Sequence, residues 1–239
     1  MFPSHDRGGD ITSTVQADTT AGFSIMTYAG TTGDVHTIGH GLGVTPDVWI
    51  VKQRSNGGSF QDWFFWHKDM AASNVVDNRM LFLNKTDAVG TYTGINAVTS
   101  STIRVKSSTT AQNGKTYCAY IFAEKQGYSK FNKYVGNGST NGTFVYTGFK
   151  PAFVMTKKRD QVSNWTIYDN KRDPFNVADT VLLPNATNAD QTVINFDFVS
   201  NGFKCRNSGS ENESGTIYIY MAFAENPFTT STGIPTTAR

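Results

Sequence analysis

Histidine and acidic side chains are the groups in this sequence that could carry acid–base or metal chemistry. His36 and His40 lie four residues apart in a segment typical of a strand entering a turn, which separates them by about 13 Å unless the turn folds back. We therefore expect His40 to cap the glycine-rich turn that follows it. Cys118 and Cys205 lie within apolar runs and are expected to be buried free thiols. We predict no metal site and no cofactor.

Aspartates near the tryptophan-containing segments raise the alternative of a glycan-cleaving enzyme. A glycosidase needs two carboxyl groups about 5 Å or about 6.5–9.5 Å apart, one of them with a raised pKa. Asp62 and Asp169 are the residues to test for this role, although an aspartate beside a turn usually caps that turn. The sequence contains no phosphate-binding loop, nucleophile elbow or zinc-helix motif. We expect a protein without catalytic residues.

The composition indicates that strands position these side chains. Hydrophobic residues make up 38% and charged residues 17% of the chain, and Thr, Ser, Asn and Gly are abundant in place of helix-forming residues. The net charge is +2 and the basic residues form no stripe, so we expect no nucleic-acid partner. No window approaches the ~18 apolar residues of a membrane span, so we expect no membrane insertion.

The chain contains an internal repeat of about 100 residues. Matching blocks occur in one order at residues 46–54 and 151–159, 62–67 and 164–169, and 114–124 and 215–225. Short strands separated by turn residues within each copy are typical of a β-sandwich. We therefore predict an all-β protein with two tandem, jelly-roll-like β-sandwich domains. The predicted parts are an N-terminal arm at 1–21, repeat 1 at 22–124, repeat 2 at 125–225 and a C-terminal tail at 226–239.

The tryptophan-containing strand of each repeat has two distinct faces. Alternation places Trp63 on one face of residues 63–67 and places Phe64 and Trp66 on the other. We take the face that both repeats share as core, and the predicted core side chains are Trp63, Trp165, Phe122 and Phe223. The residues predicted to contact a ligand, the sister domain or another subunit are Phe64, Trp66, His67, Tyr168 and Asp169.

The strands expected at 116–124 and 216–224 are apolar on both faces. A strand of a two-layer sandwich usually has one solvent-exposed face, so a second apolar face predicts a further buried surface. That surface would lie between the two repeats or between chains. We expect a homo-oligomer, with a trimer as the working hypothesis.

Several segments carry a recognisable pattern. They are Gly22-Phe-Ser-Ile, His40-Gly-Leu-Gly, Pro46-Asp-Val-Trp-Ile-Val, Tyr134-Val-Gly-Asn-Gly, Phe144-Val-Tyr-Thr-Gly-Phe, Trp165-Thr-Ile-Tyr-Asp-Asn-Lys-Arg and the tail Thr232-Gly-Ile-Pro-Thr-Thr-Ala-Arg239. Together they resemble a family of tandem domains in proteins of tailed bacteriophages. The resemblance implies a component of the phage particle and supplies no catalytic residue. Because residues 1–10 lack the apolar segment of a signal peptide, we expect synthesis in the host cytoplasm.

Three functions remain open at this point. The leading hypothesis is a non-enzymatic virion structural protein of tail-fibre, tail-tip or surface-decoration type. It would mediate particle assembly and host-surface attachment, with other virion proteins as partners. The second is a lectin-like receptor-binding module in which rings such as Trp66 and Tyr168 stack on sugars of the host surface. The third is the glycan-cleaving enzyme.

Overall fold

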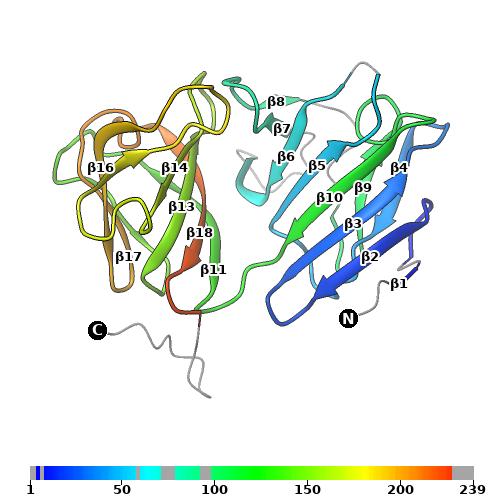
Figure 1. Cartoon of the computed structure of the whole chain (residues 1–239), viewed down its shortest axis with the longest axis horizontal. Coiled ribbons are helices and arrows are strands. Elements are labelled where there is room, and N and C mark those ends of the chain that lie inside the picture. Colours follow the sequence, from blue (N-terminus) through cyan, green and yellow to red (C-terminus); the bar gives the residue numbers. More distant parts are fainter. Residues whose placement is uncertain (1–3, 6–7, 58–59, 71–78, 92–97, 228–239) are drawn as a thin grey trace. The chain divides into compact units, whose positions relative to one another are not determined.

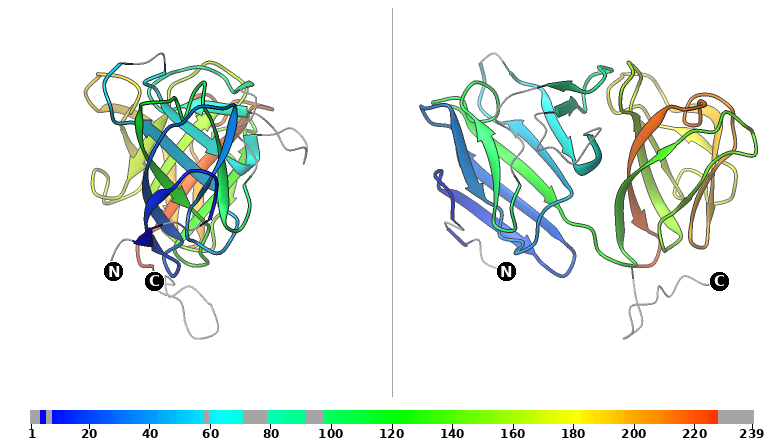
Figure 2. Two further views of the ribbon diagram at one scale, coloured as in Figure 1. Left: turned by 90° about the vertical axis from the view of Figure 1, so that its right-hand side faces the viewer. Right: turned by 180° about the vertical axis from the view of Figure 1, so that it is seen from behind.

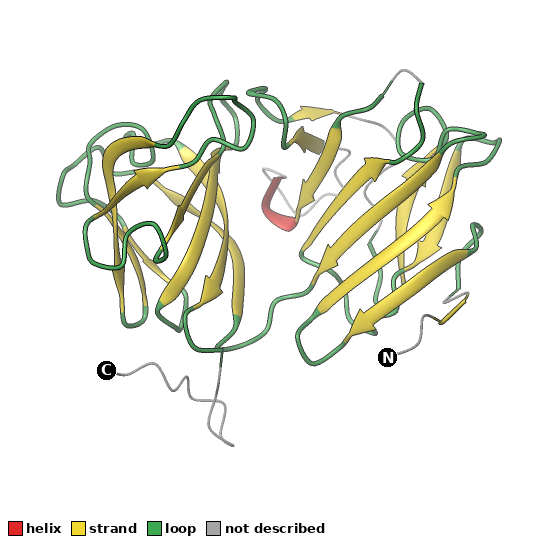
Figure 3. Cartoon of the chain, in the orientation of Figure 1, coloured by secondary structure: helices red, strands yellow, loops and turns green. Residues whose placement is uncertain are grey.

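The computed structural model describes residues 4–5, 8–57, 60–70, 79–91 and 98–227 (Figure 1). Within these residues the chain consists of strands and loops, with one short 3-10 helix at Lys68–Met70 (Figure 3). It divides into two compact units: unit 1 comprises Met1–Leu83 and Val89–Ala123, and unit 2 comprises Asn84–Ala88 and Glu124–Arg239. The all-β prediction is confirmed, and the several sheets are consistent with a β-sandwich architecture.

Unit 1 contains an eight-stranded sheet with the order β1-β2-β3-β10-β5-β6-β7-β8 and a two-stranded sheet of β4 and β9. The strands are β1 (Ser4–His5), β2 (Ser13–Asp18), β3 (Phe23–Ala29), β4 (Val35–Gly39), β5 (Val48–Gln53), β6 (Trp63–His67), β7 (Arg79–Phe82), β8 (Gly90–Thr91), β9 (Thr102–Lys106) and β10 (Thr116–Phe122). The Ser24 hydroxyl donates to the His40 carbonyl at 2.6 Å, which ties β3 to the end of β4. Residues 13–18, expected within an N-terminal arm, instead form β2 and pair with β3.

Unit 2 consists of two four-stranded sheets, β11-β18-β13-β14 and β12-β17-β16-β15, which lie face to face (Figures 1 and 2). The strands are β11 (Ser129–Val135), β12 (Phe144–Tyr146), β13 (Pro151–Lys158), β14 (Thr166–Asp169), β15 (Ala178–Val181), β16 (Gln191–Val199), β17 (Gly202–Cys205) and β18 (Ile217–Ala224). Alternate side chains of β18 enter the core between the sheets: Tyr218, Tyr220 and Ala222. Phe196 and Phe203 meet them from the opposite sheet. Most of the expected C-terminal tail lies outside the described residues.

The two units share one strand plan. The order β3-β10-β5-β6 in unit 1 corresponds to β11-β18-β13-β14 in unit 2, and the pair β4–β9 corresponds to β12–β17. The register also corresponds, since Val51 pairs with Phe64 in unit 1 where Thr156 pairs with Thr166 in unit 2.

A pair of stacked tyrosines binds one loop in each unit. One tyrosine comes from the strand of the shared plan that is first in the chain, and the other comes from the strand that is last. In unit 2, the rings of Tyr134 and Tyr218 stack with centroids 4.9 Å apart and planes 7° apart. The Tyr134 hydroxyl donates to the Glu211 carbonyl at 2.7 Å, and the Tyr218 hydroxyl donates to the Ser210 carbonyl at 2.7 Å. The Glu213 amide donates to the Tyr218 hydroxyl at 3.0 Å. We call this arrangement the tyrosine latch of unit 2.

Unit 1 contains the same latch. Tyr28 and Tyr117 stack at 5.2 Å and 12°, and the Tyr28 hydroxyl donates to the Thr110 carbonyl at 2.6 Å. The Gln112 amide donates to the Tyr117 hydroxyl at 2.9 Å, and that hydroxyl donates to the Thr109 carbonyl at 3.4 Å. In each unit the latch holds the loop that precedes the last strand at three backbone groups.

The predicted faces of the tryptophan-containing strands need correction. Trp63, predicted as core, is 37% exposed because it is the first residue of β6. Phe64, Trp66 and Tyr168, predicted to point out of the core, are at most 9% exposed, and Tyr168 lies within the core of unit 2. The error arose because β6 is apolar on both faces, so that alternation alone could not identify the inner one.

The other predicted core side chains differ in burial. Trp165 is 1% exposed, whereas Phe122 and Phe223 are only half-buried. Phe122 contacts the ring of Phe23 at 5.0 Å, and Phe223 contacts the ring of Phe131 at 5.6 Å. Both phenylalanines therefore take part in ring clusters rather than in a fully enclosed core.

Close packing of the latched loop against a glycine gives the first testable prediction. A Cβ atom on Gly136 would lie 2.3 Å from the Glu213 carbonyl oxygen, so we expect Gly136→Ala to displace the latched loop and lower the free energy of unfolding by about 1–3 kcal/mol. Gly209→Ala, in the latched loop itself but with no atom within 4 Å of the added Cβ, is the control and should change the free energy of unfolding by no more than about 0.5 kcal/mol. Urea denaturation measures both. Equal stability of the two variants would contradict the packing described.

Candidate functional site

The residues predicted to contact a ligand, the sister domain or another subunit come from both units, because β6 belongs to unit 1 and β14 belongs to unit 2. His67 is buried, and its Nδ1 accepts a hydrogen bond from the Asp69 amide at 3.1 Å. Asp169 accepts hydrogen bonds from the Lys171 and Arg172 amides at 3.0 and 2.9 Å and pairs with the Arg172 guanidinium group. Asp169 therefore caps the turn after β14.

The histidine pair and the cysteines have structural environments. His36 Nε2 lies 3.1 Å from the Ser107 hydroxyl, while His40 Nε2 lies 3.2 Å from the Thr99 carbonyl. His40 Nδ1 accepts from the Leu42 amide, and burial lowers the pKa of His40. Both cysteines are free thiols, Cys205 buried and Cys118 partly exposed. Among the described residues, no group of three or more His, Cys, Asp or Glu side chains could hold a metal ion.

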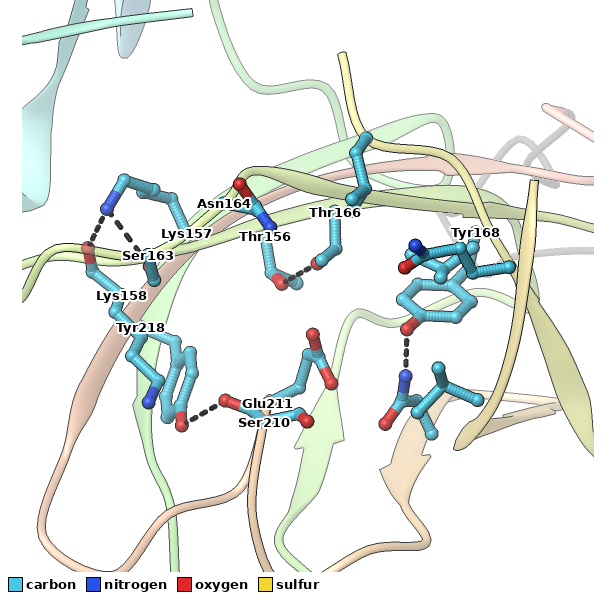
Figure 4. A pocket seen from close by; sticks show the side chains of 15 residues that line it. Thr156, Lys157, Lys158, Ser163, Asn164, Thr166, Tyr168, Ser210, Glu211 and Tyr218 are labelled. Carbon is cyan, nitrogen blue, oxygen red and sulfur yellow. Dashed lines mark hydrogen bonds between the residues drawn. The ribbon is translucent and has the colours of Figure 1, made fainter. Parts of the chain in front are cut away.

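A polar cavity of about 300 Å³ lies within unit 2 (Figure 4). Its lining comes from β13, β14, β15, β16 and β18, from the connections β13–β14 and β15–β16, and from the latched loop. The lining residues are Thr156, Lys157, Lys158, Ser163, Asn164, Thr166, Tyr168, Val181, Leu183, Gln191, Val193, Asn195, Ser210, Glu211 and Tyr218. Asn164, Gln191, Val193 and Ser210 are exposed and form its rim. Sites for small polar ligands are typically concavities of this kind, with a few converging polar groups.

The tyrosine latch places Glu211 in this cavity. Because the carbonyl groups of Ser210 and Glu211 accept the two latch hydroxyls, the backbone is fixed and the Glu211 side chain points inward. Figure 4 shows its carboxyl group directed toward the hydrogen-bonded pair of Thr156 and Thr166, whose hydroxyls are 2.8 Å apart. The Glu211 residue is 6% exposed, and its Oε2 atom has no hydrogen-bond partner among the described residues.

Burial controls the protonation of Glu211. Desolvation raises the pKa of its carboxyl group to about 7, although its own backbone, the nearby side chains of Thr166 and Asn207 and the positive charge of Lys158 oppose the shift. The group is therefore near half-protonation at neutral pH. It can accept two hydrogen bonds at one oxygen when ionised, or donate one when protonated.

Lys157 supports the wall of the cavity. Its ammonium group donates to the Lys158 carbonyl at 2.9 Å, the Gln161 carbonyl at 3.0 Å and the Ser163 hydroxyl at 3.0 Å. Three acceptors use all three N–H groups, so the side chain holds the 158–163 turn in place. Burial lowers the pKa of Lys157 to about 8.

Sequence reasoning missed Glu211 because it lies in a polar loop, where an acidic residue usually faces solvent. One signal was present: alignment of the two repeats places Glu211 opposite Thr110, so only the second copy has a carboxyl group there. The burial itself depends on the latch, which joins residues 77 positions apart in sequence.

Comparison with known proteins identifies the family. The model of a family described as Domain of unknown function (DUF7483) matches residues 3–227, so the chain belongs to this family. The match spans both units. No curated protein matches the chain, and no solved structure does. In the described part of the chain, no helix is long and apolar enough to cross a membrane.

The raised pKa of Glu211 predicts a pH-dependent stability. Between pH 4.5 and about 7, the Glu211 carboxyl group keeps its proton in the folded state. The same group in the unfolded chain, with a pKa near 4.5, has lost its proton in this range. The free energy of unfolding should therefore fall by about 3 kcal/mol from this group as the pH rises through that range. Glu211→Gln should remove this dependence.

Urea denaturation of the wild type and Glu211→Gln across this pH range measures the difference between their profiles. Glu213→Gln, which removes an exposed carboxylate two residues away, is the control and should keep the wild-type fall. Parallel profiles for the wild type and Glu211→Gln would contradict the burial of the carboxyl group.

Proposed function

We propose that the protein is a non-enzymatic structural subunit of a bacteriophage particle, of tail-fibre, tail-tip or surface-decoration type, that serves assembly and host-surface attachment. The observation that carries the proposal is the use of one β-sandwich plan twice, with the same strand order and the same tyrosine latch. This correspondence supports a tandem duplication, which is the organisation of the phage domains that the sequence resembles. The family match across both units supports their acting together as one module.

The expected partners are further copies of the same chain and other virion proteins. Rings that stay half-buried, such as Phe122 and Phe223, and exposed rings, such as Tyr146 at 63% and Phe144 at 45%, support association between copies. A trimer remains the working hypothesis. The net charge of +2 gives no reason to add nucleic acid as a partner.

The structure gives less support to the two alternative functions, sugar binding by the tryptophan-containing strands and glycan cleavage. Stacking of sugars on Trp66 and Tyr168 has lost its basis, because both rings are at most 9% exposed. The glycan-cleaving alternative needs a second carboxyl group facing the first, and Glu211 is the one carboxyl group among the described residues that line the cavity. Two aspartates were named for that role: Asp169 caps a turn, and neither it nor Asp62, which belongs to unit 1, lines the cavity.

Purified particles of the phage that encodes the chain provide the test. Mass spectrometry of particles banded by density should detect the protein in many copies, and it should be absent from the same fractions of an uninfected lysate. Light scattering after size-exclusion chromatography should show an oligomer for the isolated chain. A monomer at every concentration, together with absence from the particles, would overturn the proposal.

A further inference from the structure

The polar character of the unit 2 cavity stands out against the equivalent region of unit 1. The pair Thr156 and Thr166 occupies the strand positions that Val51 and Phe64 occupy in unit 1. Glu211 likewise occupies the latch position of Thr110. Val51 and Phe64 are at most 1% exposed and fill the equivalent region with apolar side chains. The same strand plan is thus compatible with an apolar interior.

Keeping polar groups in the interior of unit 2 has a cost. A buried carboxyl oxygen without a hydrogen-bond partner lowers the stability of the folded state. Since apolar packing at the equivalent positions of unit 1 avoids that cost, the polar groups of unit 2 require another explanation. Such departures from good packing commonly mark binding sites.

The unsatisfied groups define the chemistry of the occupant. Glu211 Oε2 offers an acceptor, whereas the Tyr168 hydroxyl already accepts from the Asn195 amide group. The occupant must therefore donate a hydrogen bond to Glu211, as a hydroxyl group can. The Lys157 ammonium is already saturated and offers nothing to an anion.

The apolar part of the lining and the volume of the cavity narrow the chemical class of the occupant further. Val181, Leu183 and Val193 supply apolar surface next to the polar groups. The volume of about 300 Å³ equals that of about ten water molecules at ~30 Å³ each, which suits one sugar ring. A sugar ring, with hydroxyl groups on its edge and C–H groups on its face, matches both the polar and the apolar part of the lining.

We propose that the unit 2 cavity binds a single neutral sugar ring or a similar polyol, with Glu211 accepting a hydrogen bond from one of its hydroxyl groups. The occupant enters past the exposed rim residues Gln191 and Val193. Unit 1, with Thr110 and an apolar interior in place of these groups, does not bind it. The site is independent of the proposed virion role and would be present whichever particle or cell the chain belongs to.

Titration of the full ¹⁵N-labelled chain with D-glucose, D-galactose, D-mannose and N-acetyl-D-glucosamine, followed by NMR, tests the proposal. At least one of these sugars should give saturable shifts, with a millimolar or lower Kd, at amides that line the cavity and none in unit 1. Glu211→Thr, which introduces the residue of unit 1, should weaken that binding at least tenfold. Glu213→Gln removes a nearby exposed carboxylate and should change Kd less than twofold.

A second variant tests the cavity rather than the carboxyl group. Thr156→Val combined with Thr166→Phe introduces the apolar pair of unit 1 and should abolish the shifts while the chain stays folded. Absence of saturable shifts with all four sugars, shifts confined to residues outside the lining, or unchanged binding by Glu211→Thr would each overturn the proposal. Should either variant fail to fold, the wild-type titration and the location of its shifts still decide the question.

Discussion

The hydrogen bonds between a stacked tyrosine pair and the loop before the last strand are the constraint on which each unit depends. In unit 2, Tyr134 comes from β11 and Tyr218 from β18, and both bind carbonyl groups of the 209–213 loop. A buried carbonyl group without a hydrogen-bond partner lowers the stability of the folded state. The loop can therefore detach only if its carbonyl groups and the latch hydroxyls become exposed to water. The loop therefore behaves as part of the sandwich rather than as a mobile connection.

Use of one latch in two chemical settings explains how the units differ. In unit 1 the latched loop presents Thr110 above an interior that includes Val51 and Phe64. In unit 2 it presents Glu211 above a threonine pair and leaves a cavity. The latch hydroxyls bind backbone groups of the loop, so their hydrogen bonds do not depend on the side chain at the position of Thr110 and Glu211. The shared strand plan can therefore hold either a packed apolar interior or a polar one.

The sequence was sufficient to predict the all-β class, because turn residues and apolar runs report on local structure. It was insufficient for the faces of β6, where Phe64, Phe65 and Trp66 are all buried and alternation carries no information. It also could not place Glu211, whose burial depends on tyrosines from two other segments of the chain. Long-range hydrogen bonds of this kind leave no periodic pattern in a single sequence.

Amide hydrogen exchange, followed by NMR on the native chain, tests the latch most directly. The amides of Gln112 and Glu213 donate to latch hydroxyls within loops, where amides otherwise exchange quickly. The account predicts that both exchange as slowly as the amides of the paired strands β10 and β18. Exchange of these two amides at the rate of an exposed loop would contradict it.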